Sequence, residues 1–92
     1  MVKMQSKPLT ASQIRAARAL LRWSAEDLAQ RSAVGVATIR RAEVSEDKTS
    51  LTIPNNSAIR TSLEIAGVEF IDENGGGPGV RLRKHQRSKN AK

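Results

Sequence analysis

The sequence contains no cysteine, so disulfide bonds and thiolate chemistry are excluded. It has one histidine, His85, with no clustered carboxylates beside it to form a metal site or a nucleophile–base pair. No apolar run approaches the roughly 20 residues that span a bilayer, and residues 1–10 lack the apolar segment of a signal peptide. We therefore expect a cytoplasmic protein that is not an enzyme and uses no metal or cofactor.

Positive charge is concentrated at the C-terminal end. The chain has 92 residues, 16 basic and 9 acidic, and a net charge of +7. Six of the basic residues and no acid lie in 81–92, so residues 1–80 hold ten basic against nine acidic residues. A short chain of this size makes one domain, expected over residues 9–83, after a flexible N-terminus over 1–8. The basic tail over 84–92 is either a disordered, solubilising end or a non-specific contact to a polyanion.

The first half of the chain predicts three helices. Thr10 and Gln13 form a capping-box pattern before a helix over 11–22, in which apolar residues recur every three or four positions. Ser24 caps a second, short helix to about residue 32, and a brief connection over 33–35 leads into a third helix over 36–43. Small or apolar side chains are expected where these elements meet, namely Ile14, Ala17, Leu20, Leu21, Leu28, Ala29, Ala33, Val34, Ile39 and Ala42.

The second half predicts a fourth helix and a β-hairpin. A polar loop over 44–53 is expected to fold Leu51 and Ile53 back on the core, before a helix over 54–66 that begins with a proline. Alternating residues over 68–71 and 80–83 read as two strands. The glycine-rich run between them lacks the Lys-Ser/Thr ending of a phosphate-binding loop, so we interpret 72–79 as the hairpin turn.

Two stretches resemble one known family. Residues 20–43, LLRWSAEDLAQRSAVGVATIRRAE, and residues 59–84, IRTSLEIAGVEFIDENGGGPGVRLRK, are similar to the Xre/Cro (lambda-repressor-like) helix-turn-helix regulators. Together they extend the resemblance over residues 9–84. It implies a mainly α, four-helix helix-turn-helix domain with a C-terminal β-hairpin. It also implies a dimeric repressor or autoregulator that inserts the helix over 36–43 into the major groove of a palindromic double-stranded DNA operator.

The sequence departs from this family at three positions. The family usually has glycine at the turn, whereas this chain has Ala33 and a glycine two positions later. Gly35 stands where a serine or threonine usually caps the third helix, and Ala25 replaces a glutamine that often touches phosphate. These differences remove individual side-chain contacts to phosphate but leave the predicted fold unchanged.

Candidate DNA contacts lie on and beside the third helix. Arg40 and Arg41 are expected to contact bases or phosphates, because arginine binds guanine through two parallel hydrogen bonds. Small apolar side chains beside them would lie against thymine methyl groups, and backbone amides at two helix starts would bind phosphate. Arg31 is equally compatible with a phosphate contact and with an ordinary surface charge, and Trp23 is expected in the core. The full candidate set is Ser24, Arg31, Gly35, Val36, Ala37, Arg40 and Arg41.

The hairpin is the candidate dimer interface. Two short strands leave open edges that favour pairing with a second copy, and the expected contact residues are Val68, Phe70, Ile71, Val80 and Leu82. Two other functions remain open. The near-neutral charge of residues 1–80 is compatible with an antitoxin or anti-activator that acts mainly by binding a partner protein. A non-specific architectural DNA binder, dominated by its basic tail, is the third possibility.

Overall fold

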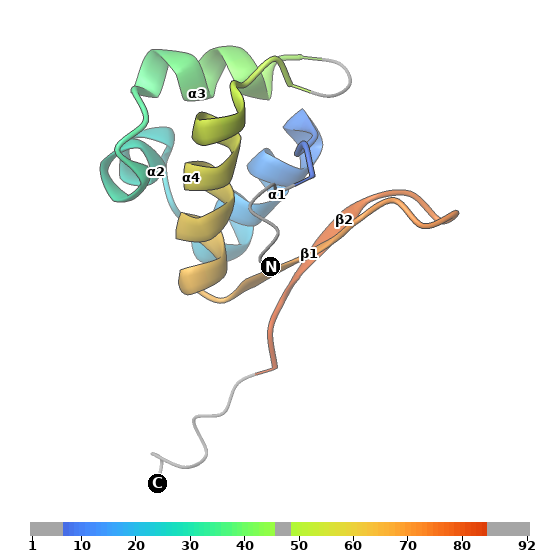
Figure 1. Cartoon of the computed structure of the whole chain (residues 1–92). Helices are drawn as coiled ribbons and strands as arrows, with labels where there is room; N and C mark the ends of the chain where they lie inside the picture. Colours follow the sequence, from blue (N-terminus) through green and yellow to red (C-terminus); the bar gives the residue numbers. More distant parts are fainter. Residues whose placement is uncertain (1–6, 46–48, 85–92) are drawn as a thin grey trace, which may run out of the picture.

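A computed structural model describes residues 7–45 and 49–84, in which four helices are followed by a two-stranded antiparallel hairpin (Figure 1). The predicted fold class, a mainly α domain with a C-terminal β-hairpin, is confirmed. The first six residues of the expected flexible N-terminus, and all but Lys84 of the expected basic tail, lie outside the described residues.

Helix α1 (Ala11–Leu21) begins at the predicted capping box. The Thr10 hydroxyl accepts a hydrogen bond from the Gln13 backbone N–H at 3.0 Å, and the Gln13 side chain accepts one from the Thr10 N–H at 3.0 Å. The helix ends at Arg22, whose φ of +60° is left-handed. The expectation that Leu20 is buried is wrong, because this residue lies at the margin of the apolar stripe in the last turn and is 40% exposed.

Helices α2 (Ala25–Ser32) and α3 (Val36–Glu43) are joined by the three residues 33–35, as predicted. Ser24 and Asp27 form a second capping box at the start of α2. The left-handed backbone of the turn falls on Ala33, with φ +63°, and the Ala33 N–H donates to the Ala29 carbonyl at 2.9 Å. Gly35 has φ −59°, so the glycine of this turn does not take over the left-handed position.

The core lies where α1, α2, α3 and α4 (Ile53–Ile65) meet, and the first residue of the hairpin joins it. The predicted loop residue Leu51 packs against this core, whereas Ile53 begins α4 and stays exposed. The largest fully buried side chains are Leu9, Ile14, Leu28, Ile39, Ile59, Leu63 and Val68.

The hairpin consists of β1 (Val68–Ile71) and β2 (Gly79–Leu82), with Phe70 opposite Val80. Strand β2 starts one residue earlier than predicted. The glycine-rich run forms the turn at the far end of the hairpin (Figure 1), and Gly75 and Gly77 have positive φ there. The buried Gln13 amide donates hydrogen bonds to the carbonyls of Ile71 at 3.3 Å and Gly79 at 3.0 Å, which ties the hairpin to the first turn of α1.

Candidate nucleic-acid interface

Helix α3 has one face in the core and one face in solvent. Ile39 and Ala42 are buried, whereas Ala37, Arg40 and Arg41 are exposed. Residues three or four positions apart share a helix face, so the exposed residues line the side of α3 that points away from the core. In Figure 1 this helix lies at one end of the molecule, across the N-terminal end of α4.

The exposed face of α3 differs from the predicted one at both ends of the helix. Val36 was expected to face DNA, but it is half-buried and packs against the core. Gly35 is exposed at the N-cap and provides no side-chain hydrogen bond to the helix start. Val44, which directly follows α3, is 77% exposed and lies one turn beyond Arg40 and Arg41. Val44 was not among the predicted residues of this face, because its position was expected to belong to the loop over 44–53.

Arg40 lies on the side of α3 that faces α2. Its guanidinium donates a hydrogen bond to the carboxylate of Glu26, in the first turn of α2, and forms an ion pair with it. The pKa of Glu26 is lowered, first by a hydrogen bond from its own backbone N–H and then by Arg40. Both side chains are more than half exposed, at 57% for Arg40 and 63% for Glu26. This pair therefore lies in solvent beside the outward face of α3.

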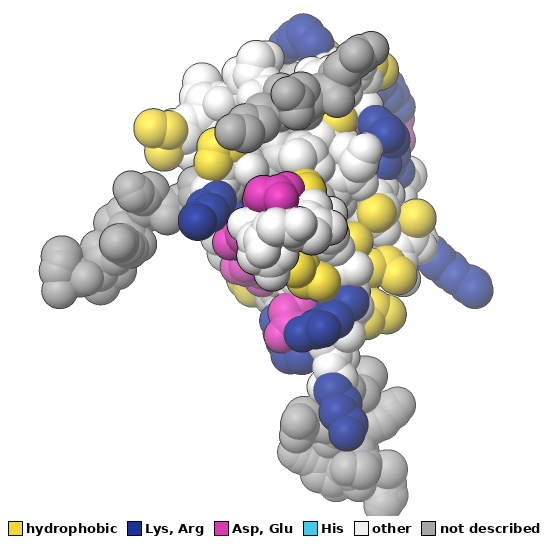
Figure 2. Space-filling view, turned by 90° about the vertical axis from the view of Figure 1, so that its right-hand side faces the viewer, with side chains coloured by type: hydrophobic (Ala, Val, Ile, Leu, Met, Phe, Trp, Pro, Cys, Tyr) yellow, Lys and Arg dark blue, Asp and Glu magenta, His cyan; other side chains and the backbone are white. Residues whose placement is uncertain are grey.

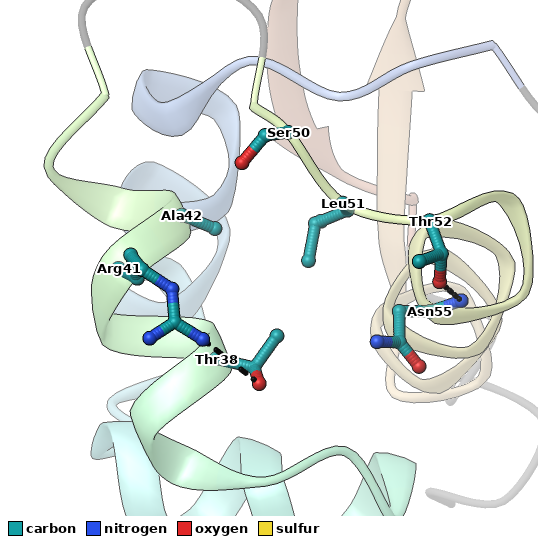
Figure 3. Close-up of a pocket in the computed structure, with 7 residues that line it drawn as sticks. All are labelled: Thr38, Arg41, Ala42, Ser50, Leu51, Thr52 and Asn55. Atoms are coloured by element: carbon teal, nitrogen blue, oxygen red, sulfur yellow. Dashed lines mark hydrogen bonds between the residues drawn. The ribbon is translucent and has the colours of Figure 1, made fainter.

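Arg41 lies on the other side, at a cavity between α3 and α4. The cavity has a volume of about 210 Å³, and Leu51 projects into it between the two helices (Figure 3). Arg41 donates a hydrogen bond to the Thr38 hydroxyl at 3.5 Å, and the Thr52 hydroxyl accepts one from the backbone N–H at the start of α4. The complete lining is Thr38, Arg41, Ala42, Ser50, Leu51, Thr52 and Asn55.

The sequence did not predict that polar residues of the loop and of α4 would lie beside α3 at this cavity. Ser50 and Asn55 belong to a segment that was assigned to a loop and a helix start, and their approach to α3 depends on the crossing of two elements that are separate along the chain. The only local signal was the threonine two residues before Pro54, which is typical of a helix N-cap.

The start of α2 also borders the candidate interface. Ser24 is exposed and caps the helix, and hydrogen bonds from Ser24 lower the pKa of Asp27. Arg31, at the other end of α2, lies over the ring of Trp23 with its guanidinium carbon 4.7 Å from the ring centroid. Trp23 itself is half-buried against the core, so its predicted core position is confirmed only in part. Arg31 thus has an aromatic partner within the protein that the sequence did not indicate.

Two arginines of α1 hold α3 in position. Arg18 binds both carboxylate oxygens of the buried Glu43 at 2.7 Å, and it also donates to the Trp23 carbonyl at 2.9 Å. The hydrogen bond to Glu43 raises the pKa of Arg18. Arg15 donates a further hydrogen bond to the Glu43 backbone carbonyl. The C-terminal end of α3 is therefore fastened to α1 through charged groups, whereas its middle is held by apolar packing.

The predicted dimer residues divide into two groups. Val68 is fully buried, so the expectation that it forms part of a dimer surface is wrong. Phe70 and Val80 are partly buried and pack against the core of the same chain, and their role in a dimer stays a prediction. They lie on the hairpin face that covers the helices. Leu82 remains 48% exposed and Ile71 is partly exposed. In Figure 2, which looks toward the hairpin turn, hydrophobic side chains gather along one flank of the hairpin.

No family model and no curated protein matches this chain. Within residues 7–45 and 49–84, no group of three or more histidine, cysteine, aspartate or glutamate residues is placed to hold a metal ion. None of the helices described is both long enough and apolar enough to pass through a membrane. His85 lies outside the described part of the chain.

Proposed function

We propose that the protein is a sequence-specific, double-stranded DNA-binding transcriptional regulator of the cytoplasm that inserts α3 into the major groove. The observation that carries this proposal is the division of α3 into a buried face and an exposed face with an arginine at each margin. A major groove about 12 Å wide admits one helix. The similarity of residues 20–43 and 59–84 to the Xre/Cro regulators supports the same reading.

The surroundings of α3 favour a polyanion. Arg40 lies beside the first turn of α2, and Arg41 lies beside the first turn of α4. Helix N-termini present free backbone N–H groups and a partial positive charge, so they bind phosphate without a particular side chain. In this arrangement, α3 reads the bases while the starts of α2 and α4 contact the backbone on either side of the groove.

Conservative substitutions of the two arginines test this proposal. Arg40→Lys and Arg41→Lys keep the positive charge but lose the planar fork that binds guanine in a bidentate manner. We expect each to retain affinity for random DNA and to lose about 5- to 100-fold of the preference for the selected site. Alanine at both positions should weaken binding to all sequences as well. Fluorescence anisotropy with labelled duplexes measures both quantities, and an unchanged preference in every variant would refute the role of α3.

We also propose that the protein binds its operator as a homodimer through the hairpin. Each strand has one edge that no other strand covers in the described part of the chain, and open edges favour pairing between copies. Leu82 and Ile71 are the predicted contact residues that stay accessible. Sedimentation equilibrium should give a dimeric mass that Leu82→Glu lowers without changing the circular dichroism spectrum. A monomeric wild-type mass at micromolar concentration, unchanged by operator DNA, would overturn this part.

A protein-binding module of the antitoxin or anti-activator kind is the second candidate. The observation in its favour is a set of large apolar side chains in solvent, with Val44 77%, Ile53 73% and Ile65 80% exposed. Isolated exposed apolar residues are normal on protein surfaces, so this observation carries less than the arginines of α3. Two results together would argue against the regulator: no preference among DNA sequences, and loss of DNA binding when residues 84–92 are removed. They would favour this candidate or the architectural binder.

A further inference from the structure

Glu26 is an acidic residue on a surface that, under the proposed function, approaches a polyanion. It is 63% exposed, and its side-chain oxygen accepts a hydrogen bond from Arg40. The two neighbouring acids have structural roles, since Asp27 closes the capping box of α2 and Glu43 binds Arg18 in the core. Glu26 is in neither arrangement, and exposed ion pairs contribute little to stability. A carboxylate in the first turn of α2 adds modestly to helix stability through the helix dipole, but this contribution does not require an ion pair with Arg40.

The geometry of the pair leaves Arg40 able to bind a base. A guanidinium group has five N–H donors in a planar fork, and the hydrogen bond to Glu26 uses one terminal nitrogen, NH2. Each edge of the guanidinium that can bind guanine in a bidentate manner includes this nitrogen, which carries two N–H groups. One N–H of this nitrogen and that of its neighbour on the same edge therefore stay available for the O6 and N7 acceptors of guanine. An arginine side chain free in solvent samples many rotamers, whereas one attached to a carboxylate is restricted before DNA arrives. Glu26 thus favours one direction from which Arg40 approaches the groove.

The same carboxylate acts against non-specific binding. Its negative charge lies in the first turn of α2, where it weakens, without abolishing, the attraction between the backbone N–H groups and phosphate. It also offsets part of the positive charge of Arg40. Both effects reduce attraction to any DNA sequence, whereas the restricted orientation favours sequences with guanine at the matching position. Specificity is the difference between the affinity for the matching site and the affinity for random DNA. Glu26 increases this difference by lowering the second affinity and by favouring the orientation of Arg40 that suits the first.

We infer that Glu26 is a positioning residue that sets the base preference of Arg40 and lowers affinity for random DNA. This inference rests on the proposed DNA-binding function. Glu26→Gln keeps the size of the side chain and an oxygen acceptor but removes the charge. We expect it to bind random duplexes about two- to fivefold more tightly, as for the loss of one exposed like charge. Discrimination at the one base pair contacted by Arg40 should fall about fivefold or more.

The experiment compares the full chain with four variants, Glu26→Gln among them, on the wild-type selected site and on its single-base-pair substitutions. Glu73→Gln is the matched control, because Glu73 is an exposed acid of the hairpin, far from α3 in the chain, and loses the same charge. Arg40→Lys and the double variant Glu26→Gln/Arg40→Lys complete a double-mutant cycle. The loss of discrimination should be confined to one base-pair position in each half-site and should not add to that of Arg40→Lys.

Other outcomes separate failure of this inference from failure of the proposed function. If Glu26→Gln shifts the affinity for every sequence by the same factor, in either direction, Glu26 acts only through its charge and the positioning role is refuted. If the loss in the double variant equals the sum of the single losses, Glu26 does not act through Arg40. If the wild-type protein has no sequence preference at all, the proposed regulator function fails first.

Discussion

Replacing Ala33 with glycine should stabilise the protein, although glycine normally destabilises folded structure. Ala33 ends α2 with φ +63°, a left-handed conformation that costs an L-residue about 1–2 kcal/mol. Its side chain is exposed, so removal of the methyl group opens no cavity. Glycine adopts this conformation without strain but loses about 0.4–1 kcal/mol through the greater entropy of the unfolded chain. The net expectation is a gain of about 0.5–1 kcal/mol in the free energy of unfolding.

Ala37→Gly is the matched control for this substitution. Ala37 is also exposed but lies in the first turn of α3, where glycine costs up to about 0.5–1 kcal/mol relative to alanine. The two variants should therefore differ by roughly 1–2 kcal/mol, or about 4–16 °C in Tm for a domain of this size. Thermal and urea melts followed by circular dichroism at 222 nm measure this difference. A lower stability of Ala33→Gly than of the wild type would show that the turn does not have the described geometry.

Three further variants test how α3, the hairpin and α2 are held. Glu43→Gln should cost about 2–4 kcal/mol in urea melts, because it leaves Arg18, 22% exposed, without its carboxylate, whereas an unchanged stability would contradict the described ion pair. Gln13→Ala should cost about 1–3 kcal/mol by leaving two hairpin carbonyls without their donor, and hydrogen exchange should rise first in the hairpin if this tie is real. The lowered pKa of Asp27, caused by hydrogen bonds from Ser24, makes its contribution complete above the ordinary aspartate pKa. This contribution is lost as pH falls through the lowered value, so wild type and Asp27→Asn should converge in Tm at low pH, and a constant difference would argue against the capping box.

Local chemistry made most of the fold predictable. Thr10 with Gln13, and Ser24 with Asp27, occur at the spacing of a capping box, and each starts a helix within one residue of its predicted position. The proline of α4 lies in the first helical turn, as expected. The hairpin followed from alternation and a glycine-rich turn, both of which depend only on neighbouring residues. Interactions of short sequence range therefore determined the element boundaries.

Contacts between distant elements were not predictable in the same way. Arg18 and Glu43 appear in the sequence as two ordinary surface charges, and only the packing of α1 on α3 brings them together. The cation–π contact of Arg31 depends likewise on how a helix boundary turns Trp23. The alternation of side chains predicted that β1 has two faces. It did not predict that one of these faces packs against the core of the same chain. The left-handed conformation falls on Ala33, although glycine would adopt it more easily, because the crossing of α2 and α3 determines which residue takes it.

Selection of bound duplexes from a random pool tests whether α3 recognises DNA sequence. We expect one enriched, palindromic site whose half-sites lie about 34 Å apart along the duplex. Binding to that site should exceed binding to random DNA by about 10³-fold or more at physiological salt. The same selection with Arg40→Ala/Arg41→Ala should enrich nothing. Enrichment of the same site by this double variant, or no enrichment by the wild type, would contradict the recognition of DNA sequence by α3.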